Sequence, residues 1–231
     1  MKIKKLISAL VLGSMLVGLS GCNITDFSAE NLLRPPKAVG DEAEIEQLIA
    51  KTADSGYTLK YPKNGKFRSA IIMTDLDGND SNEAVAFFRN SAETSSVHML
   101  VMYSKDKSWK IASDNIFETT DIDSVDFADL TGNGKAEIIV NSTTYTPNVG
   151  KLSCYSYSEG KTNEVGSGQS CSSFVTGDFD NDGTSEIMSL VLYTTENEAL
   201  ASMLDYNEDS KSLYAKAMAN MDPNVVKYKN I

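Results

Sequence analysis

The sequence of 231 residues predicts an all-β fold, a partial β-propeller of about three blades, preceded by a signal peptide, a tether and one short helix. Two observations predict it. From Tyr57 onward, short β-branched and aromatic runs alternate with polar turn clusters, which is typical of an all-β domain. A nine-residue phrase rich in Asp, Asn and Gly also recurs three times, about every 50 residues, and this period is typical of propeller blades.

Residues 1–21 have the parts of a secretory signal peptide. Three lysines within the first five residues give a positively charged start, and a mostly apolar run of 14 residues follows from Leu6 to Leu19. This run is too short for a transmembrane helix, which needs about 20 residues. It is followed by small residues, as expected before a cleavage point.

The segment closes with Leu19-Ser20-Gly21-Cys22, which resembles the lipobox of bacterial lipoproteins. The resemblance implies that Cys22 receives a diacylglyceryl group and becomes the first residue of the mature chain. Two acyl chains anchor a protein stably, so the expected membrane contact is the lipid on Cys22. We therefore expect an exported protein held at the outer face of the bacterial cell membrane. The alternative is an ordinary signal peptide with an incidental cysteine.

The mature chain divides into three parts. Residues 22–40 are the expected flexible tether, since a Pro-Pro pair prevents regular structure there. Residues 41–56 contain the one expected helix, over roughly 41–53, because apolar residues recur at helical spacing and acids occupy the first turn. Residues 57–231 contain the β repeats.

Charge narrows the class of partner. Removal of residues 1–21, which contain three lysines and no acid, changes the formal charge from −11 to −14. Nucleic-acid binding is therefore not expected, since it needs basic patches. An acidic mature chain suits cation binding, although a soluble, solvated surface is a sufficient explanation for the same charge.

The repeated phrase begins with an aspartate and has a glutamate at position 9. The first aspartates are Asp75, Asp129 and Asp178, which are 54 and then 49 residues apart. Oxygens at positions 1, 3 and 5 of a tight loop can converge on one centre, and the carboxylate at position 9 can close the shell. Such a set suits calcium, a hard ion that binds several oxygens. Glycine at position 4 or 6 permits the positive φ that the curl requires.

The three copies offer unequal ligand sets. The candidate ligands are Asp75, Asp77, Asn79 and Glu83 in the first copy, Asp129, Thr131, Asn133 and Glu137 in the second, and Asp178, Asp180, Asp182 and Glu186 in the third. The third is the best calcium site because it has four carboxylates. The second has two carboxylates, so an empty turn held by hydrogen bonds is the alternative there. A metal-free Asp/Asn/Gly hairpin turn is the alternative for any lone copy.

In residues and spacing, the three phrases resemble the FG-GAP/VCBS repeats of integrin-like β-propellers, in which each loop joins two strands of a four-stranded blade. With the segments 32–37 and 57–62, they also resemble a group of uncharacterised Gram-positive lipoproteins that carry such repeats. The resemblance implies the fold and a structural role for calcium. It implies no reaction.

Three blades are fewer than a closed ring needs, since closed propellers have about four or more. A further period after Asp178 would place a fourth first aspartate at 227–232, whereas the sequence ends at Ile231. We therefore expect a fragment of a longer propeller. The alternative is an open stack of three sheets with unpaired strand edges.

Two cysteines remain after lipidation, Cys154 and Cys171. Export permits a disulfide between them, but the sequence does not establish that their geometry allows one. The single histidine, His98, lies in an alternating run, and we expect it to be a surface or packing residue of a strand rather than a catalytic one.

These observations favour a non-catalytic binding or scaffold module whose blades are stabilised by calcium and whose loops meet a surface glycan, wall polymer or protein. The alternative is a glycan- or polysaccharide-active surface enzyme. Its candidate acids outside the loops are Asp121, Asp123 and Asp126, because glycosidic chemistry needs two carboxylates across a cleft. A solvated strand face explains the same three acids more simply.

Overall fold

The computed structural model describes residues 40–54, 56–93, 95–144, 149–193 and 197–224. Strands make up 57% of these residues and one helix is present among them, so the predicted all-β class is confirmed. The signal peptide, Cys22, nearly all of the tether and the expected start of a fourth repeat lie outside the described residues. Within them, no helix is long and apolar enough to cross a membrane.

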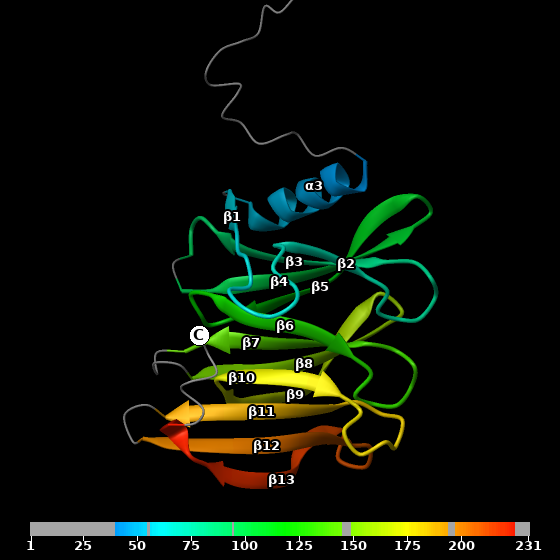
Figure 1. Cartoon of the computed structure of the whole chain (residues 1–231). Helices are drawn as coiled ribbons and strands as arrows, with labels where there is room; N and C mark the ends of the chain where they lie inside the picture. The colour runs from blue at the N-terminus through cyan, green and yellow to red at the C-terminus, as the bar shows by residue number, and fades with distance from the viewer. Residues whose placement is uncertain (1–39, 55, 94, 145–148, 194–196, 225–231) are drawn as a thin grey trace, which may run out of the picture. The chain divides into compact units, whose positions relative to one another are not determined.

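The helix α3 (Asp41–Ala53) occupies the segment for which the sequence predicts a helix. Its first turn contains three acids, which the helix dipole favours at that end. Ile45, Ile49 and Ala53 are fully or almost fully buried on one side of it. They pack in one hydrophobic cluster with Phe88 and other residues of the first sheet, so the helix covers that face of the sheet (Figure 1).

The strands of the described residues form three antiparallel sheets, which we name A, B and C, and none of them closes on itself. Sheet A consists of β1 (Tyr57–Leu59), β2 (Ile71–Thr74), β3 (Glu83–Asn90), β4 (Val97–Lys105) and β5 (Ser108–Phe117). Sheet B consists of β6 (Ile122–Ala128), β7 (Glu137–Thr143), β8 (Gly150–Ser158) and β9 (Lys161–Cys171). Sheet C consists of β10 (Ser173–Gly177), β11 (Glu186–Tyr193), β12 (Glu198–Asn207) and β13 (Ser212–Met221).

Each sheet contains a meander of four consecutive strands. In sheets B and C the order along the sheet is the order along the chain. In sheet A the same meander runs from β2 to β5, and the short strand β1 is added beside β3. Two of the polar turn clusters of the sequence, at 104–108 and 158–161, connect β4 to β5 and β8 to β9. Their central residues have positive φ, as tight hairpin turns require.

The sheets are stacked on one another (Figure 1), and the faces in contact are apolar. One buried cluster joins sheets A and B, with Phe87 and Met99 on one side and Ile138 and Val140 on the other. A second cluster joins sheets B and C around Cys154. Both faces of sheets A and B therefore lie against other elements. This explains why the apolar residues of β3 and β7 are consecutive, over 84–88 and 138–140, and do not alternate with polar ones.

Candidate cation-binding loops

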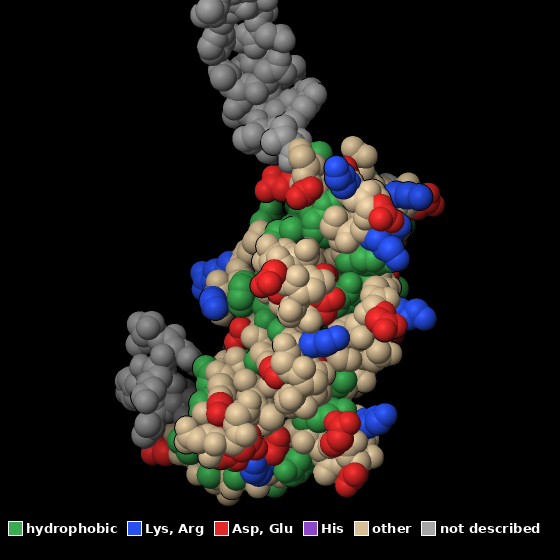
Figure 2. All heavy atoms as spheres, turned by 90° about the vertical axis from the view of Figure 1, so that its right-hand side faces the viewer, with side chains coloured by type: hydrophobic (Ala, Val, Ile, Leu, Met, Phe, Trp, Pro, Cys, Tyr) green, Lys and Arg blue, Asp and Glu red, His purple; other side chains and the backbone are tan. Residues whose placement is uncertain are grey.

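The three repeated phrases lie at the same place in their sheets. Loop 1 (75–83) connects β2 to β3, loop 2 (129–137) connects β6 to β7, and loop 3 (178–186) connects β10 to β11, each including the first residue of the following strand. All three lie at the right-hand end of the sheets in Figure 1. Figure 2 shows the molecule from that side, with Asp and Glu side chains at several places on the surface and Lys or Arg beside some of them.

Two acids hold the curl of every loop. The carboxylate at position 1 accepts hydrogen bonds from the backbone N–H groups of positions 5 and 6. The glutamate at position 9 accepts one from the N–H of position 2. The nitrogen–oxygen distances for this second bond are 2.9 Å from Leu76 to Glu83, 2.8 Å from Leu130 to Glu137, and 2.8 Å from Phe179 to Glu186. The Asp and Glu at the two ends are therefore needed to shape the loop, with or without a metal.

Positions 4 and 6 of each loop are in the left-handed region of φ. Loop 2 has glycine at both, whereas Asp80 in loop 1 and Asn181 in loop 3 adopt φ values of 65° and 62°. Asp and Asn tolerate this region better than other non-glycine residues. Asp80 therefore fits where the sequence pattern prefers glycine.

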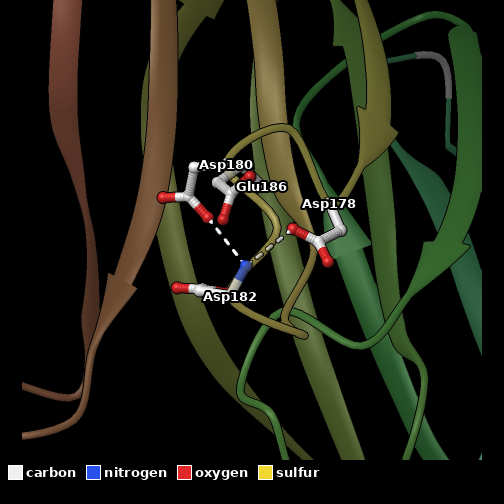
Figure 3. Close-up of side chains that lie close together, drawn as sticks. All are labelled: Asp178, Asp180, Asp182 and Glu186. Atoms are coloured by element: carbon white, nitrogen blue, oxygen red, sulfur yellow. Dashed lines mark hydrogen bonds between the residues drawn. The ribbon is translucent and has the colours of Figure 1, made fainter.

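Loop 3 brings four carboxylates to one point. One oxygen from each of Asp178, Asp180, Asp182 and Glu186 lies within 4.8 Å of the others, and Figure 3 shows these side chains around the curl of the loop. Glu186 is completely buried, and its Oε1 atom has no hydrogen-bond partner. Burial raises the pKa of Glu186, and the neighbouring Asp180 and Asp182 raise it further. The loop therefore contains a buried acceptor that its own groups do not satisfy.

Loop 1 also has converging oxygens and a buried oxygen without a partner, but it has fewer carboxylates than loop 3. Asp75, Asp77 and Glu83 bring one oxygen each within 4.8 Å of the others. The Oδ1 atom of Asp77 is buried without a partner, and burial raises the pKa of Glu83. Asn79 uses its side-chain oxygen to accept the N–H of Ser81 at 2.7 Å. Burial acts to raise the pKa of Asp75, but backbone N–H groups outweigh it and lower that pKa.

Loop 2 satisfies its own glutamate. The Oε2 atom of Glu137 accepts the N–H of Leu130, and its Oε1 atom accepts the hydroxyl of Thr131 at 3.2 Å. Asn133 accepts the N–H of Lys135 at 2.9 Å. Each side chain proposed as a ligand between positions 3 and 9 thus has a hydrogen-bond partner inside the loop, and Asp129 is the only other carboxylate in it.

The donor sets of loops 1 and 3 fit calcium. They consist of carboxylate and amide oxygens, which hard divalent cations prefer. Each also includes a buried oxygen without a partner, and such a group in a folded protein calls for an ion or water. In loop 2 the Thr131 hydroxyl already performs this role for Glu137.

Neighbouring loops are joined by backbone hydrogen bonds. The N–H of Ala136 in loop 2 donates to the carbonyl of Leu76 in loop 1 at 3.0 Å. The N–H of Ser185 in loop 3 donates to the carbonyl of Asp129 in loop 2 at 2.8 Å. Both bonds use position 8 of one loop and position 1 or 2 of the loop before it. Loop 2 therefore connects the two loops that have unpartnered oxygens.

Two residues outside the repeats complete the surroundings of loop 3. Asp205 on β12 and Lys216 on β13 form an ion pair, with the Lys216 Nζ atom 2.9 Å from an Asp205 oxygen. The same Nζ atom lies 2.5 Å from an oxygen of Asp180. The hydrogen bonds to Asp180 and then Asp205 raise the pKa of Lys216. Sequence reasoning missed both residues because no spacing within β12 and β13 relates them to the loop.

The three acids considered for glycan chemistry are engaged in separate contacts. Asp121 pairs with Lys60 at 2.5 Å and with Lys63 at 3.2 Å. Asp123 accepts from the Asn64 amide at 2.9 Å, and Asp126 accepts from the Thr176 hydroxyl at 2.7 Å. Asp121 directly precedes β6, and Asp123 and Asp126 lie on it; all three are half-buried, and each contacts another segment of the chain.

The disulfide between Cys154 and Cys171 is not formed, and both thiols are free and buried. The register pairs Cys154 with Gly166 and Cys171 with Gly150, on neighbouring strands β8 and β9. The two cysteines are thus four positions apart along the strands, about 13 Å at 3.3 Å per residue, which exceeds the separation of about 7 Å that a disulfide permits. Burial raises the pKa of the Cys171 thiol to about 12.

His98 is a packing residue of β4, as the sequence predicts. Its ring stacks on Phe88 with 4.8 Å between the ring centroids. Its two nitrogens lie 2.9 Å from Asp114 and 3.1 Å from Glu93. The buried ring therefore has carboxylate partners on both sides.

Comparison with known proteins does not assign the chain to a family. No family model matches it, and no curated protein matches it either.

Proposed function

We propose that this protein is a lipid-anchored, extracytoplasmic binding or scaffold module, built on a partial β-propeller of three FG-GAP/VCBS-type blades that calcium stabilises. The observation that carries the proposal is the recurrence of one loop in three stacked sheets, with unpartnered oxygens on Asp77 in loop 1 and Glu186 in loop 3. Four-stranded meanders stacked face to face are also the expected arrangement of propeller blades.

The role proposed for calcium is structural. An ion that binds only the folded state stabilises it by about 2.7 kcal/mol at a hundredfold excess over Kd. For a chain of this size, that corresponds to a rise of roughly 5 to 10 °C in Tm. The test is scanning calorimetry of the full chain in calcium, in chelator, and in magnesium as a matched control. Equal Tm values in calcium and chelator would contradict the proposal.

The lipid anchor is proposed from the segment Leu19-Ser20-Gly21-Cys22 and from the short apolar run before it. The test is an intact mass of the native protein extracted from the host membrane with detergent. We expect a diacylglyceryl or triacyl increment on a chain that begins at Cys22. The Cys22→Ala variant should lack this increment and leave the membrane fraction. A native mass without lipid would contradict the anchor.

The proposed partner is a surface glycan, a wall polymer or another protein. Support comes from the placement of three hydrogen-bonded loops side by side at one end of the sheets, where they form a surface of acidic and polar groups. The test is co-sedimentation of the full chain with purified cell wall and with wall polymers, in calcium and in chelator. Binding that needs calcium would support the proposal, and cleavage of the polymer would instead favour an enzyme.

A further inference from the structure

We propose that Lys216 is an internal counter-cation for loop 3, which pairs with the loop in the metal-free state and must be displaced or shared when a calcium ion enters. This inference rests on the proposed calcium role of loop 3. It adds a residue from outside the repeat that sets how tightly that loop binds the ion.

The geometry places the Lys216 ammonium on a ligand of the candidate site. Its Nζ atom lies 2.5 Å from the Oδ2 atom of Asp180, and Asp180 is one of the four residues whose oxygens converge in loop 3. The other oxygen of Asp180 accepts the backbone N–H of Asp182 at 3.2 Å. Both oxygens of Asp180 are thus engaged, so an ion that binds this carboxylate must displace or share one of these two contacts.

A second carboxylate holds the ammonium in this place. The Oδ2 atom of Asp205 lies 2.9 Å from Nζ, and the Asp205 side chain is only 13% exposed. The hydroxyl of Tyr214 donates to the same Asp205 oxygen at 3.2 Å. A lysine released from Asp180 would therefore keep Asp205 as its partner, so displacement does not require the ammonium to move into an apolar environment.

The pairing satisfies only part of the loop. The buried Oε1 atom of Glu186 remains without a partner, and Lys216 reaches Asp180 but forms no bond to Glu186 among the contacts of the described residues. The ammonium therefore neutralises the exposed side of the carboxylate cluster and leaves its buried side open for an ion. A compact divalent ion among the four carboxylates can contact both sides at once.

The electrostatic cost to calcium follows from the charges. A divalent ion and an ammonium about 5 Å apart repel by an amount that lowers affinity on the order of tenfold, even at the dielectric constant of bulk water. Removal of the Lys216 charge should therefore tighten calcium binding by about this factor or more. The same removal should destabilise the metal-free protein, since Asp180 and Asp205 would lose their shared counter-charge.

The experiment compares Lys216→Met, Lys216→Arg and the wild-type full chain by calorimetric titration with calcium and by thermal unfolding in chelator. Lys151→Met is the matched control, because it removes one exposed lysine from β8 in sheet B. Glu186→Gln identifies which part of the calcium signal belongs to loop 3. We expect Lys216→Met to bind calcium at loop 3 at least tenfold more tightly and to have a lower Tm in chelator. Lys216→Arg and Lys151→Met should stay within about threefold of the wild-type affinity.

The outcomes separate this inference from the proposed function. If the wild type binds calcium, Glu186→Gln loses that binding and Lys216→Met binds no more tightly, the inference is overturned while the calcium role stands. If the wild type binds no calcium but Lys216→Met does, the inference is supported and the calcium role of the native loop is overturned. If neither protein binds calcium at loop 3, both are overturned.

Discussion

Loops 2 and 3 have the same backbone curl, yet they satisfy their glutamates in different ways. In loop 2 the residue at position 3 is Thr131, whose hydroxyl donates to Glu137. In loop 3 the residue at position 3 is Asp180, a second acceptor, and an oxygen of Glu186 stays unpartnered. Loop 1 has Asp77 at position 3 and also has an unpartnered buried oxygen. A hydrogen-bond donor at position 3 satisfies the glutamate at position 9. An acceptor at position 3 leaves a buried oxygen in the loop without a partner, which a cation can satisfy.

The largest effect is expected for Asp180→Thr in loop 3. A hydroxyl at position 3 should close loop 3 onto Glu186, as Thr131 closes loop 2 onto Glu137. We expect the variant to lose the stabilisation that calcium provides through loop 3, about 2.7 kcal/mol at a hundredfold excess over Kd. Chemical denaturation in calcium and in chelator measures it. Stability in chelator should change by less than about 1 kcal/mol, since an exposed ion pair contributes little. Undiminished calcium dependence would show that position 3 does not decide metal binding.

The contact between the two loops can be tested with glycines of loop 2. A Cβ atom added to Gly132 would lie 2.6 Å from the Cγ2 atom of Thr184 in loop 3, whereas one added to Gly134 meets nothing within 4 Å. Both residues have positive φ. We expect Gly134→Ala to cost about 1 kcal/mol from backbone strain alone. Gly132→Ala should cost about 2 kcal/mol or more because steric overlap adds to the strain. Equal losses in urea denaturation would argue against close packing of the two loops.

The reverse substitution should open loop 2. Thr131→Asp combined with Asn133→Asp gives loop 2 carboxylates at positions 1, 3, 5 and 9, as in loop 3. We expect one additional calcium ion per chain in a titration, and a gain of about 1.4 kcal/mol at a tenfold excess over Kd. In chelator the variant should be less stable than the wild type, because four carboxylates would repel one another. The single variant Asn133→Asp, which keeps the Thr131 hydroxyl, is the control and should add no site.

The smallest expected effect is a pH dependence in the metal-free protein. Burial raises the pKa of Glu186 above its ordinary value of 4.5, so the folded state retains this proton at pH values where the unfolded chain releases it. The stability contributed by the proton is fully present below pH 4.5 and is lost as the pH rises through the raised pKa.

We therefore expect that, in chelator, the loss of stability between about pH 5 and neutrality is smaller for Glu186→Gln than for the wild type. Calcium should weaken this dependence in the wild type, because protons and the ion compete for the same carboxylate. Burial raises the pKa of Glu137 too, but calcium should leave its contribution unchanged. Denaturant titrations at several pH values, with Glu137→Gln as the matched variant, measure the difference. Equal pH profiles for the two variants in calcium would contradict the distinction between the loops.

The sequence predicts those parts of the molecule that local patterns determine. The apolar spacing around Ile45 and Ile49 predicts α3, and the apolar runs after each phrase correspond to β3, β7 and β11. The ranking of the loops also follows from residue type, since only the second copy has a hydroxyl at position 3. What sequence reasoning lacked was the interpretation of that hydroxyl as a donor to position 9.

Features that depend on strand register or on contacts between distant strands could not be predicted from the sequence. Export permits a disulfide between Cys154 and Cys171, but the register of β8 against β9 places them four positions apart along the strands. Lys216 meets Asp180 only because β12 and β13 follow β11 in sheet C, next to the end of loop 3. The partners of Asp121 come from a segment that precedes β2. In each case the decisive contact joins residues that no periodicity relates.

The backbone bonds between consecutive loops have a consequence for how such repeats can diverge. Loop 2 donates to loop 1 through Ala136 and accepts from loop 3 through Asp129, and neither bond uses a side chain. Exchange of a side chain at position 3 or 5 leaves these bonds in place, whereas insertion or deletion of a single residue would shift both. After a duplication of such units, the middle copy can therefore lose its metal-binding side chains by substitution. The number of residues in its loop remains constrained. A repeat that has lost its ion can still be required as the spacer that holds its neighbours in line.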